Sequence, residues 1–481
     1  MEIEKASATA GKCAPKIDST QEGSEIMKIL LIQPPKSPRT IGGEDVFIYE
    51  PLALEYLASA VTQDHDVKIL DLRLENSFES TLTAFAPDIV GITAYTVHVN
   101  VVKTLFEKVK AWNPETLTVV GGHHATVSPE DFNSPFIDVT VTGEGVSVFK
   151  EIVRRFEKRE SLGDIPGTIV ARGGSMCRTD RSLDIDLDSF PFPYRSLTAN
   201  YRAQYYSEWM KPLASIRTSK GCPYRCSFCA EWKVAGGRYY KREPQYIVEE
   251  LAEIAEPYVF FADDESLIDA GRMTLLARLI EQAGIRKRYF LYGRSDTIAR
   301  HRELLESWRK IGLERVFIGL EFIRDEDLRY IHKNSTAKEN EEAIRILRDL
   351  DINIYASFIV RPDSSRSEFA AYPEYCRQMK LDYASFAVLT PLPGTDLYEE
   401  TKDQLLTRNY DYFDFIHALL PTRLPLEDFY TELGHLYRRA VPLSRQLSLL
   451  KKFPPREIPN LLRTGRRFYQ RLKTAHLDYA E

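Results

Sequence analysis

The residues best suited to chemistry are three cysteines, Cys222, Cys226 and Cys229, which follow a C-x3-C-x2-C spacing. Cysteine thiolates hold iron–sulfur clusters, usually four to a cluster. Three thiolates from one short loop would leave one iron of a four-iron cluster open to another ligand. A structural zinc site needs a fourth Cys or His at close range, and the nearest histidine downstream is His301. The spacing therefore favours a four-iron cluster in a reducing compartment.

The remaining cysteines, Cys13, Cys177 and Cys376, stand alone, and we expect each to be a small buried or idle residue. Six cysteines in 481 residues are too few for an extracellular disulfide framework. The net charge of −6 argues against nucleic acid as a main partner. No apolar run approaches the roughly 18 residues of a membrane span. We therefore expect a cytoplasmic protein of about three domains, at ~150 residues each.

Residues 27–150 alternate short apolar runs with amphipathic stretches, which predicts a doubly wound, Rossmann-like parallel α/β sheet. The preceding residues 1–26 are polar and lack the apolar core of a secretory signal, so we expect them to form a tail. The runs predicted to be strands are residues 29–32, 67–70, 89–93, 117–120 and 139–141.

Ligands of such sheets bind beyond the carboxyl ends of the strands, so the residues that follow each run are candidate binding residues. Glycines there let a backbone approach a bulky ligand closely, although they also make tight turns. No G-x-G-x-x-G pattern follows the first run, which disfavours a dinucleotide. The candidates are Gln33, Pro34, Thr93, Tyr95, Gly121, Gly122, His123, His124, Gly143, Glu144 and Gly145.

Residues 207–400 repeat the strand–helix alternation six times, which suits a partial (β/α)6 barrel with its chemistry at the strand ends. The three-cysteine loop follows the first of these strands. The preceding residues 151–206 contain Gly173-Gly174 and two prolines in Phe190-Pro191-Phe192-Pro193, so we interpret them as a linker. The expected barrel strands are residues 214–218, 259–262, 289–292, 316–320, 354–359 and 383–389.

The last block, residues 401–481, is expected to be mainly helical and is strongly basic. Eleven Lys and Arg residues lie between Arg438 and Lys473 against one acidic residue, Glu457, and large apolar side chains are interleaved with them. A surface of this kind can contact anionic lipid, which would bring the protein to the inner face of a membrane as a peripheral protein. A helical cap with a solvated basic face is the alternative.

The loop around Cys222, Cys226 and Cys229, placed after a first barrel strand, resembles that of the radical S-adenosylmethionine (SAM) enzymes. In that family the amino and carboxylate groups of SAM chelate the open iron of a [4Fe-4S] cluster. The reduced cluster then cleaves SAM to a 5′-deoxyadenosyl radical. The resemblance implies that Phe228, just before the last cysteine, packs near the adenine of SAM.

The same resemblance locates further SAM contacts at the ends of the following strands. Asp264 and Glu265 follow the second strand and are expected to meet the SAM ammonium, as carboxylates do for a cation. Arg294 follows the third and is expected to meet the SAM carboxylate, whereas Glu321 follows the fourth and is expected to meet the ribose hydroxyls. Residues 360–364 depart from the Gly-x-Pro-Gly-Glu-Thr run of many relatives, so no contact is assigned there. For each assigned residue, an ordinary salt bridge is the alternative.

The amino-terminal block resembles the cobalamin-binding domain that precedes the barrel in one large subgroup of these enzymes. The matching stretches are residues 121–126 and 143–145, together with residues 188–193 of the linker. The Asp-x-His-x-x-Gly pattern that supplies a lower axial histidine in other cobalamin proteins is absent after the first strand. The resemblance places His123 and His124 beside the nucleotide tail of cobalamin rather than beneath its metal.

Stretches between residues 409 and 430 are similar to the hopanoid C3 methylases, and the bacteriochlorophyll side-chain methylases look related. The resemblance implies a cobalamin-dependent radical SAM methyltransferase that methylates an unactivated carbon of a large apolar substrate. Such a C–H bond has no acidity for a general base to exploit, so a radical is needed to break it. An electron donor such as flavodoxin or ferredoxin would reduce the cluster.

Two other functions stay open at this point. An anaerobic oxidative cyclase of the magnesium-protoporphyrin type shares this architecture and transfers no methyl group. A non-catalytic cobalamin or redox sensor would need a partner or a DNA-binding module, and the sequence contains no recognition-helix motif. We expect no nucleic-acid partner.

Overall fold

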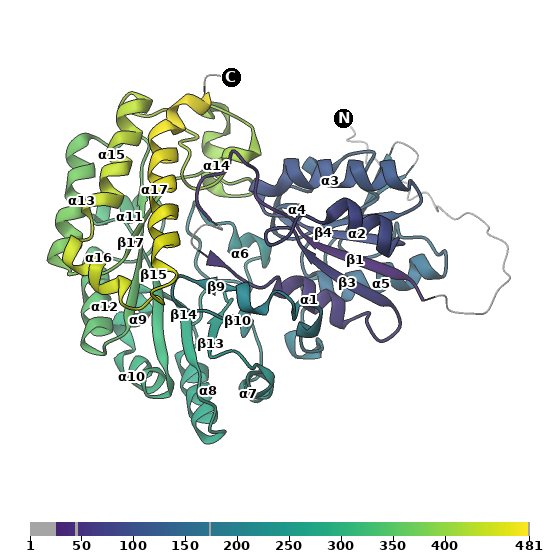
Figure 1. Ribbon diagram of the computed structural model, residues 1–481, viewed down its shortest axis with the longest axis horizontal. Helices are drawn as coiled ribbons and strands as arrows, with labels where there is room; N and C mark the ends of the chain where they lie inside the picture. Colours follow the sequence, from purple (N-terminus) through teal and green to yellow (C-terminus); the bar gives the residue numbers. More distant parts are fainter. Residues whose placement is uncertain (1–25, 44–46, 173–174, 480–481) are drawn as a thin grey trace, which may run out of the picture.

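The computed structural model describes residues 26–43, 47–172 and 175–479, which form an amino-terminal sheet domain and a barrel that carries the carboxy-terminal helices (Figure 1). Residues 1–25, which hold Cys13 and nearly all of the expected tail, lie outside the described residues.

Seven strands form the amino-terminal sheet, in the order β3-β1-β4-β5-β6-β7-β8. The first five in this order are parallel, as the alternation of apolar runs and helices predicted. Their bounds are β1 (Lys28–Gln33), β3 (Asp66–Asp71), β4 (Ile89–Thr93), β5 (Leu117–Gly121) and β6 (Val139–Val141).

Helices cover both faces of this sheet, which is why its central strands are apolar throughout. Leu31 of β1 packs against one pair of helices and its neighbour Leu30 against the other pair, and both are fully buried. The pairs are α1 (Leu52–Ser59) with α5 (Gly145–Glu157), and α2 (Phe78–Phe85) with α3 (Val99–Trp112).

The stretch that we interpreted as a linker is more structured than expected. It adds two antiparallel strands, β7 (Thr168–Arg172) and β8 (Ser175–Arg178), to the edge of the sheet. The interpretation rested partly on Gly173-Gly174, and these two residues lie outside the described residues. From residue 179 to 205 the chain makes only short 3-10 turns, as expected of a linker.

Six parallel strands form the barrel, in the order β10-β13-β14-β15-β16-β17, which confirms the partial (β/α)6 barrel. Helices that follow the strands cover its outside (Figure 1). The strands are β10 (Leu213–Ile216), β13 (Tyr258–Phe261), β14 (Arg288–Arg294), β15 (Leu313–Glu321), β16 (Asn353–Val360) and β17 (Ala384–Val388). The helices are α7 (Pro244–Glu253), α8 (Ala270–Gln282), α10 (Arg302–Ile311), α12 (Ala337–Asp349) and α13 (Arg366–Gln378).

Successive residues of each barrel strand face opposite ways. On β15, Val316 and Ile318 face the helices and are fully buried. The residues that face the interior are mostly aromatic, and Tyr292, Phe317 and Tyr383 remain partly exposed although they lie inside the barrel. Solvent therefore reaches an interior whose walls are aromatic.

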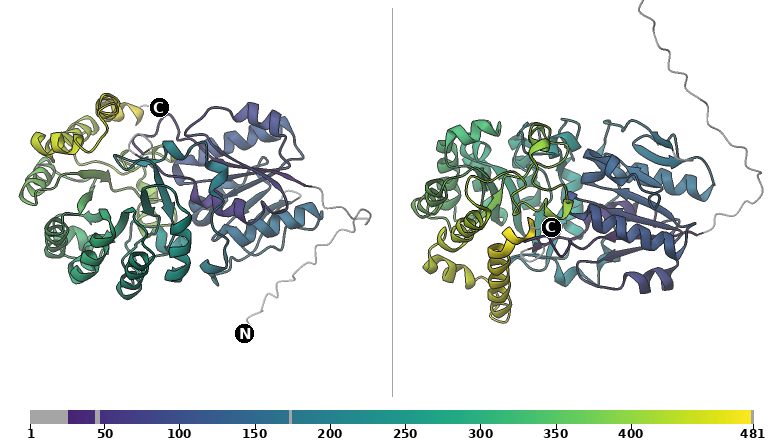
Figure 2. Two further views of the ribbon diagram at one scale, coloured as in Figure 1. Left: turned by 60° about the horizontal axis from the view of Figure 1, so that its bottom comes forward. Right: turned by 90° about the horizontal axis from the view of Figure 1, so that it is seen from above.

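The carboxy-terminal region is mainly helical, as predicted, and lies along one side of the barrel (Figure 2). Its helices are α15 (Leu426–Arg439), α16 (Leu443–Leu450) and α17 (Ile458–Thr474). Between α16 and α17, Phe453 is buried against Trp209 at the amino-terminal end of the barrel strands. None of the helices in the described part of the chain is long and apolar enough to cross a membrane.

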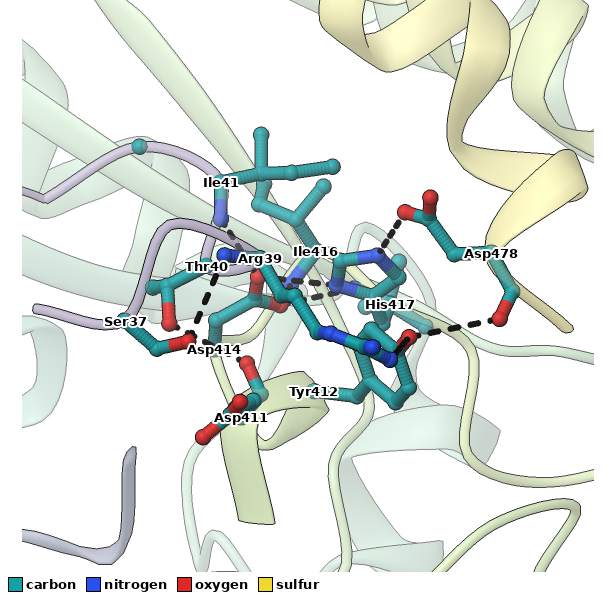
Figure 3. A network of polar contacts seen from close by, with 12 residues as sticks. Ser37, Arg39, Thr40, Ile41, Asp411, Tyr412, Asp414, Ile416, His417 and Asp478 are labelled. Atoms are coloured by element: carbon teal, nitrogen blue, oxygen red, sulfur yellow. Dashed lines mark hydrogen bonds and ion pairs between the residues drawn. The ribbon is translucent and has the colours of Figure 1, made fainter. Parts of the chain in front are cut away.

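A buried histidine joins three distant segments (Figure 3). His417 Nδ1 lies 2.8 Å from Asp414, and its Nε2 lies 2.9 Å from Asp478 near the carboxyl terminus. The loop after β1 reaches across from the sheet domain, where the Ile41 N–H donates to Asp414 at 2.7 Å. Burial alone would lower the pKa of His417, but the two carboxylates outweigh it and the pKa is raised. The imidazole of His417 thus joins Asp478 to Asp414, which in turn holds the loop after β1.

Candidate functional site

Two carboxylates beyond the end of β13 hold the base of the three-cysteine loop. Asp263 accepts the backbone N–H groups of Thr218 and Ser219 at 2.7 and 2.8 Å. Asp264 accepts the N–H of Gly221 at 2.5 Å. Gly221 has a φ of +88°, and an added Cβ would strike the carbonyl of Arg238, so only glycine fits before the first cysteine. Asp264, predicted to meet SAM, therefore also positions the loop.

The loop itself is fixed on both sides of its central cysteine. The Ser227 N–H donates to the carbonyl of Ile331 at 3.0 Å, and the Ser227 carbonyl accepts from Leu397 at 2.9 Å. Cys226 is buried, whereas Cys222 and Cys229 are partly exposed. The loop is thus held in place by backbone bonds that do not depend on a bound cofactor.

The donor set fits an iron–sulfur cluster better than a single metal ion. In the described part of the chain, no group of three His, Cys, Asp or Glu side chains converges closely enough to hold one ion. Thiolates that each bind a different iron need not converge on one point. Burial raises the pKa of Cys222 to about 11 and also raises the pKa of Cys229, so both are neutral thiols until a metal displaces their protons.

Arg294, at the end of β14, lies directly against this loop. Its guanidinium carbon is 3.6 Å from the centre of the Tyr224 ring, and its Nη1 is 3.8 Å from Cys226 Sγ. Its Nε donates to Asp296 at 2.9 Å, and its Nη2 donates to the carbonyl of Lys333 at 2.6 Å. The guanidinium brings positive charge beside a cysteine, and its bonds to Asp296 and Lys333 keep it there.

Glu265 stands behind Arg294 and is held by backbone groups. One of its oxygens accepts the N–H of Arg294 and the other accepts the N–H of Leu267, both at 3.1 Å. Burial raises the pKa of Glu265 to about 7. The carboxyl group, predicted to meet the SAM ammonium, is therefore already occupied in shaping the strand ends.

Glu321 ends β15 in a left-handed conformation, with a φ of +60°. Its Oε1 accepts from Lys333 Nζ at 2.7 Å, and both side chains are buried. Gly319 makes room for the pair, since an added Cβ there would lie 3.1 Å from Lys333 Nζ. Asn340 donates to the carbonyls on either side of Glu321, at 3.0 and 3.2 Å. Sequence reasoning missed Lys333, because only the fold brings it back to a strand end twelve residues earlier.

Phe228 points from the cysteine loop into an apolar cluster at the ends of the fourth and fifth strands. The buried members of that cluster are Phe322, Leu328, Ile331, Ile359, Leu389 and Leu397.

At the carboxyl ends of the strands of the amino-terminal sheet, which face the barrel, glycine backbone takes the place of charged side chains. Gly122 has a φ of +103°, and an added Cβ would lie 2.7 Å from Thr93 Oγ1 and 2.9 Å from the Ala94 nitrogen. Tyr95 is 57% exposed, with its ring 5.9 Å from the ring of His123. A close glycine backbone beside an exposed aromatic ring leaves room for a bulky, flat ligand, which fits the cobalamin expected here.

The two adjacent histidines of α4 (His123–Val127) behave differently. His124 is fully buried, with Nδ1 3.1 Å from Thr96 and Nε2 2.9 Å from Asp131. Both of its ring nitrogens are thus satisfied within the protein, so His124 holds the domain together and does not face a ligand. His123 instead reaches the barrel, where its Nε2 lies 3.3 Å from Glu231 in α6 (Glu231–Val234).

Glu144 also crosses to the barrel. Its carboxylate lies 2.8 Å from Lys220 and 3.2 Å from Arg217. Burial by itself raises the pKa of Glu144, but these two cations outweigh it and lower the pKa to about 2. A side chain predicted to bind cobalamin therefore joins the two domains. The flanking Gly143 donates its N–H to Thr126 Oγ1 at 3.0 Å.

The other candidates lie close to the same edge. Gln33 and Pro34 are both buried, and Gln33 Nε2 lies 3.5 Å from the carbonyl of Pro34. Gly121 ends β5, and Gly145 begins α5.

The contacts of His123 and Glu144 bring the carboxyl ends of the two sheets together. Their partners Lys220 and Glu231 were not predicted, although each lies two residues outside the cysteine motif. The fold and site thus define a barrel whose cysteine loop opens toward the ligand-binding edge of a Rossmann-like sheet.

Comparison with known proteins identifies the family. Residues 38–153 match the B12 binding domain, and residues 216–372 match the Radical SAM superfamily. The chain is 34% identical over 392 residues to the hopanoid C-3 methylase of Methylococcus capsulatus, covering 80% of this chain and 75% of that protein. The chain belongs to the cobalamin-dependent radical SAM enzymes, and its domains are those for cobalamin, SAM and a [4Fe-4S] cluster.

Two further similarities qualify this relationship. The anaerobic magnesium-protoporphyrin IX monomethyl ester cyclase of Cereibacter sphaeroides is 27% identical over 436 residues, covering 86% of this chain and 70% of that protein. The structure of the cobalamin-dependent SAM radical enzyme OxsB, with aqua-cobalamin and SAM bound, superposes with a TM-score of 0.71 at 15% identity. That superposition covers 94% of this chain and 72% of OxsB, and it supports the fold.

Proposed function

We propose that this protein transfers a methyl group to an unactivated carbon of a large apolar molecule, in the class of the hopanoid-like lipids or the tetrapyrroles. The observation that carries the proposal is the placement of the glycine-rich sheet edge directly opposite the three-cysteine loop. The higher identity to a methylase than to a cyclase favours methylation over ring closure.

Bound together, the cluster, SAM and cobalamin supply a radical and a methyl group. The chain's own residues hold these groups and exclude water from them. We assign Cys222, Cys226 and Cys229 to the cluster and Glu321, with Lys333, to SAM. The aromatic interior of the barrel, which lies below the cysteine loop, is the compartment for an apolar substrate, because its walls offer rings for stacking.

Four other assignments complete the proposal. We keep as SAM-binding residues four that lie at or beside the cysteine loop, Phe228, Asp264, Glu265 and Arg294. Asp264 and Glu265 also accept hydrogen bonds from backbone N–H groups. On the sheet, we propose that Tyr95, His123 and the neighbouring glycines bind cobalamin. His124 is left out because both of its ring nitrogens are bonded within the protein. An electron donor such as flavodoxin or ferredoxin would serve the cluster.

Labelled SAM tests the reaction. The protein is reconstituted anaerobically with iron, sulfide and cobalamin, given methyl-deuterated SAM, and incubated with lipid and pigment extracts that are then analysed by mass spectrometry. We expect a product that carries the deuterated methyl group. An unlabelled, ring-closed product would instead establish the cyclase reaction, and a complete lack of SAM turnover would favour a sensor.

We also propose that the helices α16 and α17 contact anionic lipid. Leu443, Leu447 and Leu462 are 70%, 54% and 59% exposed, and Lys and Arg residues are interleaved with them in the sequence. The test is cosedimentation with vesicles of phosphatidylcholine, with and without phosphatidylserine. Replacing the exposed Arg463 and Arg466 with glutamate should weaken binding to the anionic vesicles about thirtyfold for each arginine, because each reversal changes two unit charges at about 1 kcal/mol per charge. The matched control is Arg278→Glu on α8, and equal binding by all variants would establish the helical-cap alternative.

A further inference from the structure

A buried ion pair lies at the end of the barrel interior that is farther from the cysteines. Arg315 near the start of β15 is fully buried, and Glu208, which follows β9 (Tyr206–Ser207), is 7% exposed. Arg315 Nη1 donates to Glu208 Oε2, and the Ser207 hydroxyl donates to the same oxygen at 2.6 Å. Arg315 precedes Glu321 by six residues on the same strand, which places the pair about 20 Å from the SAM end of the barrel.

Much of the hydrogen-bonding capacity of this pair is unused. Within the described residues, Arg315 Nε and Nη2 and Glu208 Oε1 are buried and have no hydrogen-bond partner. Buried polar atoms are nearly always paired, and an unpaired charged group is especially costly. Nε and Nη2 form one edge of the guanidinium, the edge that donates two parallel bonds to an oxygen ligand.

Aromatic rings enclose the guanidinium and continue toward the cysteine loop. The Arg315 guanidinium carbon lies 4.7 Å from the ring centres of Trp209 and Tyr355, and 5.3 Å from those of Phe290 and Tyr383. Beside and above it, a further series of interior rings contact one another across the neighbouring strands β13, β14 and β15. This series comprises Phe260, Tyr292 and Phe317. The polar pair is thus the base of a long apolar compartment.

The unused atoms are two donors and one acceptor, and their net charge is already balanced. A hydroxyl group satisfies both kinds, because its oxygen accepts from the guanidinium edge and its proton goes to Glu208 Oε1. A carboxylate would satisfy the same edge, but it would bring a second negative charge beside Glu208 in a medium that screens charge poorly.

We propose that Glu208 and Arg315 bind a hydroxyl group at one end of the substrate, whose apolar body stacks along the aromatic wall. The inference rests on the proposed function for the use of this compartment. It narrows the substrate class to neutral apolar alcohols and away from anionic tetrapyrroles.

Two neutral probes that differ in one hydroxyl test the site. The reconstituted holoenzyme is titrated in detergent micelles with diplopterol, a pentacyclic triterpene alcohol, and with diploptene, the matching hydrocarbon. Binding is followed by tryptophan fluorescence, because Trp209 lies against Arg315. We expect the alcohol to bind about tenfold more tightly, as a hydrogen bond to a charged group should provide.

The double substitution Arg315→Met and Glu208→Met removes the pair without leaving a lone buried charge, an exchange that folded proteins usually tolerate. It should abolish the preference for the alcohol and leave binding of the hydrocarbon unchanged or tighter. The matched control, Arg302→Met with Glu306→Met, removes an exposed ion pair on α10 and should keep the preference.

The outcomes separate this inference from the proposed reaction. The hydroxyl site would be overturned if the wild type did not prefer the alcohol to the hydrocarbon, or if the double variant kept that preference. It would also be overturned if the wild type bound protoporphyrin more tightly than the alcohol and the double variant lost this binding. If the alcohol preference is present and is lost in the double variant, but no deuterated methyl group reaches either probe, the hydroxyl site stands and the methylation proposal fails for this class. Equal labelling of both probes by wild type and double variant would retain methylation and reject the hydroxyl site.

Discussion

The two sheets meet at their carboxyl ends, but different kinds of residue form these two ends. On the barrel, Glu265, Arg294 and Glu321 are buried, and each is bonded to backbone or to a charged side chain nearby. On the amino-terminal sheet, the corresponding positions are glycine backbone and the exposed ring of Tyr95.

The difference follows from what each edge has to hold. SAM is small and carries charged ends, so a site for it needs fixed charges whose positions are maintained by many bonds. Cobalamin is bulky, so a site for it needs space and a backbone without side chains in the way. The contacts of Glu144 and His123 then hold the two kinds of edge against each other.

The largest effect is expected on the barrel side. Replacing Cys226 with alanine removes one of three cluster ligands, so the cluster should not assemble and formation of 5′-deoxyadenosine should stop. Iron content and deoxyadenosine after anaerobic reconstitution measure this. Cys376→Ala is the control, because Cys376 is buried in α13 and far from the motif in sequence. Deoxyadenosine produced by the Cys226 variant would contradict the assignment of the loop.

A side chain at Gly122 should damage the other edge selectively. Gly122→Val introduces a Cβ into occupied space at a positive φ, at a cost of about 2–3 kcal/mol in fit. We expect cobalamin to bind roughly a hundredfold more weakly, measured by equilibrium dialysis, while the cluster still assembles. Gly465→Ala is the matched control, since its Cβ would meet nothing within 4 Å. Normal cobalamin binding by the valine variant would show that this edge is a tight turn only.

A charge-neutral change at Glu321 should affect SAM more mildly. Glu321→Gln keeps the shape of the side chain but weakens its bond to Lys333, so the strand end loses part of its positioning. We expect about tenfold weaker SAM binding, from about 1.5 kcal/mol, seen as a raised KM for deoxyadenosine formation with little change in kcat. Glu303→Gln on α10 serves as the exposed control. An unchanged KM would remove Glu321 from the SAM site.

The smallest expected effect is on the stability of the protein and depends on pH. It concerns the ion pairs of Glu144 with Lys220 and Arg217, which join the two domains. The pKa of Glu144 is lowered to about 2, so its stabilising contribution is complete above the ordinary glutamate pKa of about 4.3 and is lost as pH falls toward 2. Glu144→Gln should destabilise the protein by about 1–2 kcal/mol at pH 7. The difference from wild type should shrink between pH 5 and pH 3.

Urea unfolding midpoints of the two proteins at pH 7, 5 and 3 measure this difference. Glu115→Gln, on the exposed surface of the same domain, provides the baseline. A difference that stays constant down to pH 3 would mean that the ion pair does not stabilise the joint.

Local patterns were sufficient for most of the fold. The five parallel strands of the first domain and the six of the barrel lie where apolar runs alternate with amphipathic stretches, because a strand covered on both faces must be apolar throughout. The antiparallel strands β7 and β8 were missed, since edge strands are short and the Gly-Gly pair in this stretch of sequence was interpreted as part of a linker.

The residues of the candidate site also fall into those that the local sequence indicates and those that only the fold brings together. The cysteines were visible because a chelating motif lies within one loop, and Glu321 was visible because it ends a strand. Lys333 was not, because its approach to Glu321 depends on the path of the chain between them. His124 misled the sequence argument, since nothing local shows that Thr96 and Asp131 occupy both of its nitrogens.

The sequence by itself therefore determined the two domain types, the cluster loop and the family, because each depends on residues that lie close together in the chain. Only the tertiary structure showed which candidates, like Glu144, join the two domains. It alone brought Glu208 to Arg315, more than a hundred residues apart, at the base of the aromatic compartment. Burial and hydrogen bonding are properties of the packed chain, so no local pattern encodes them.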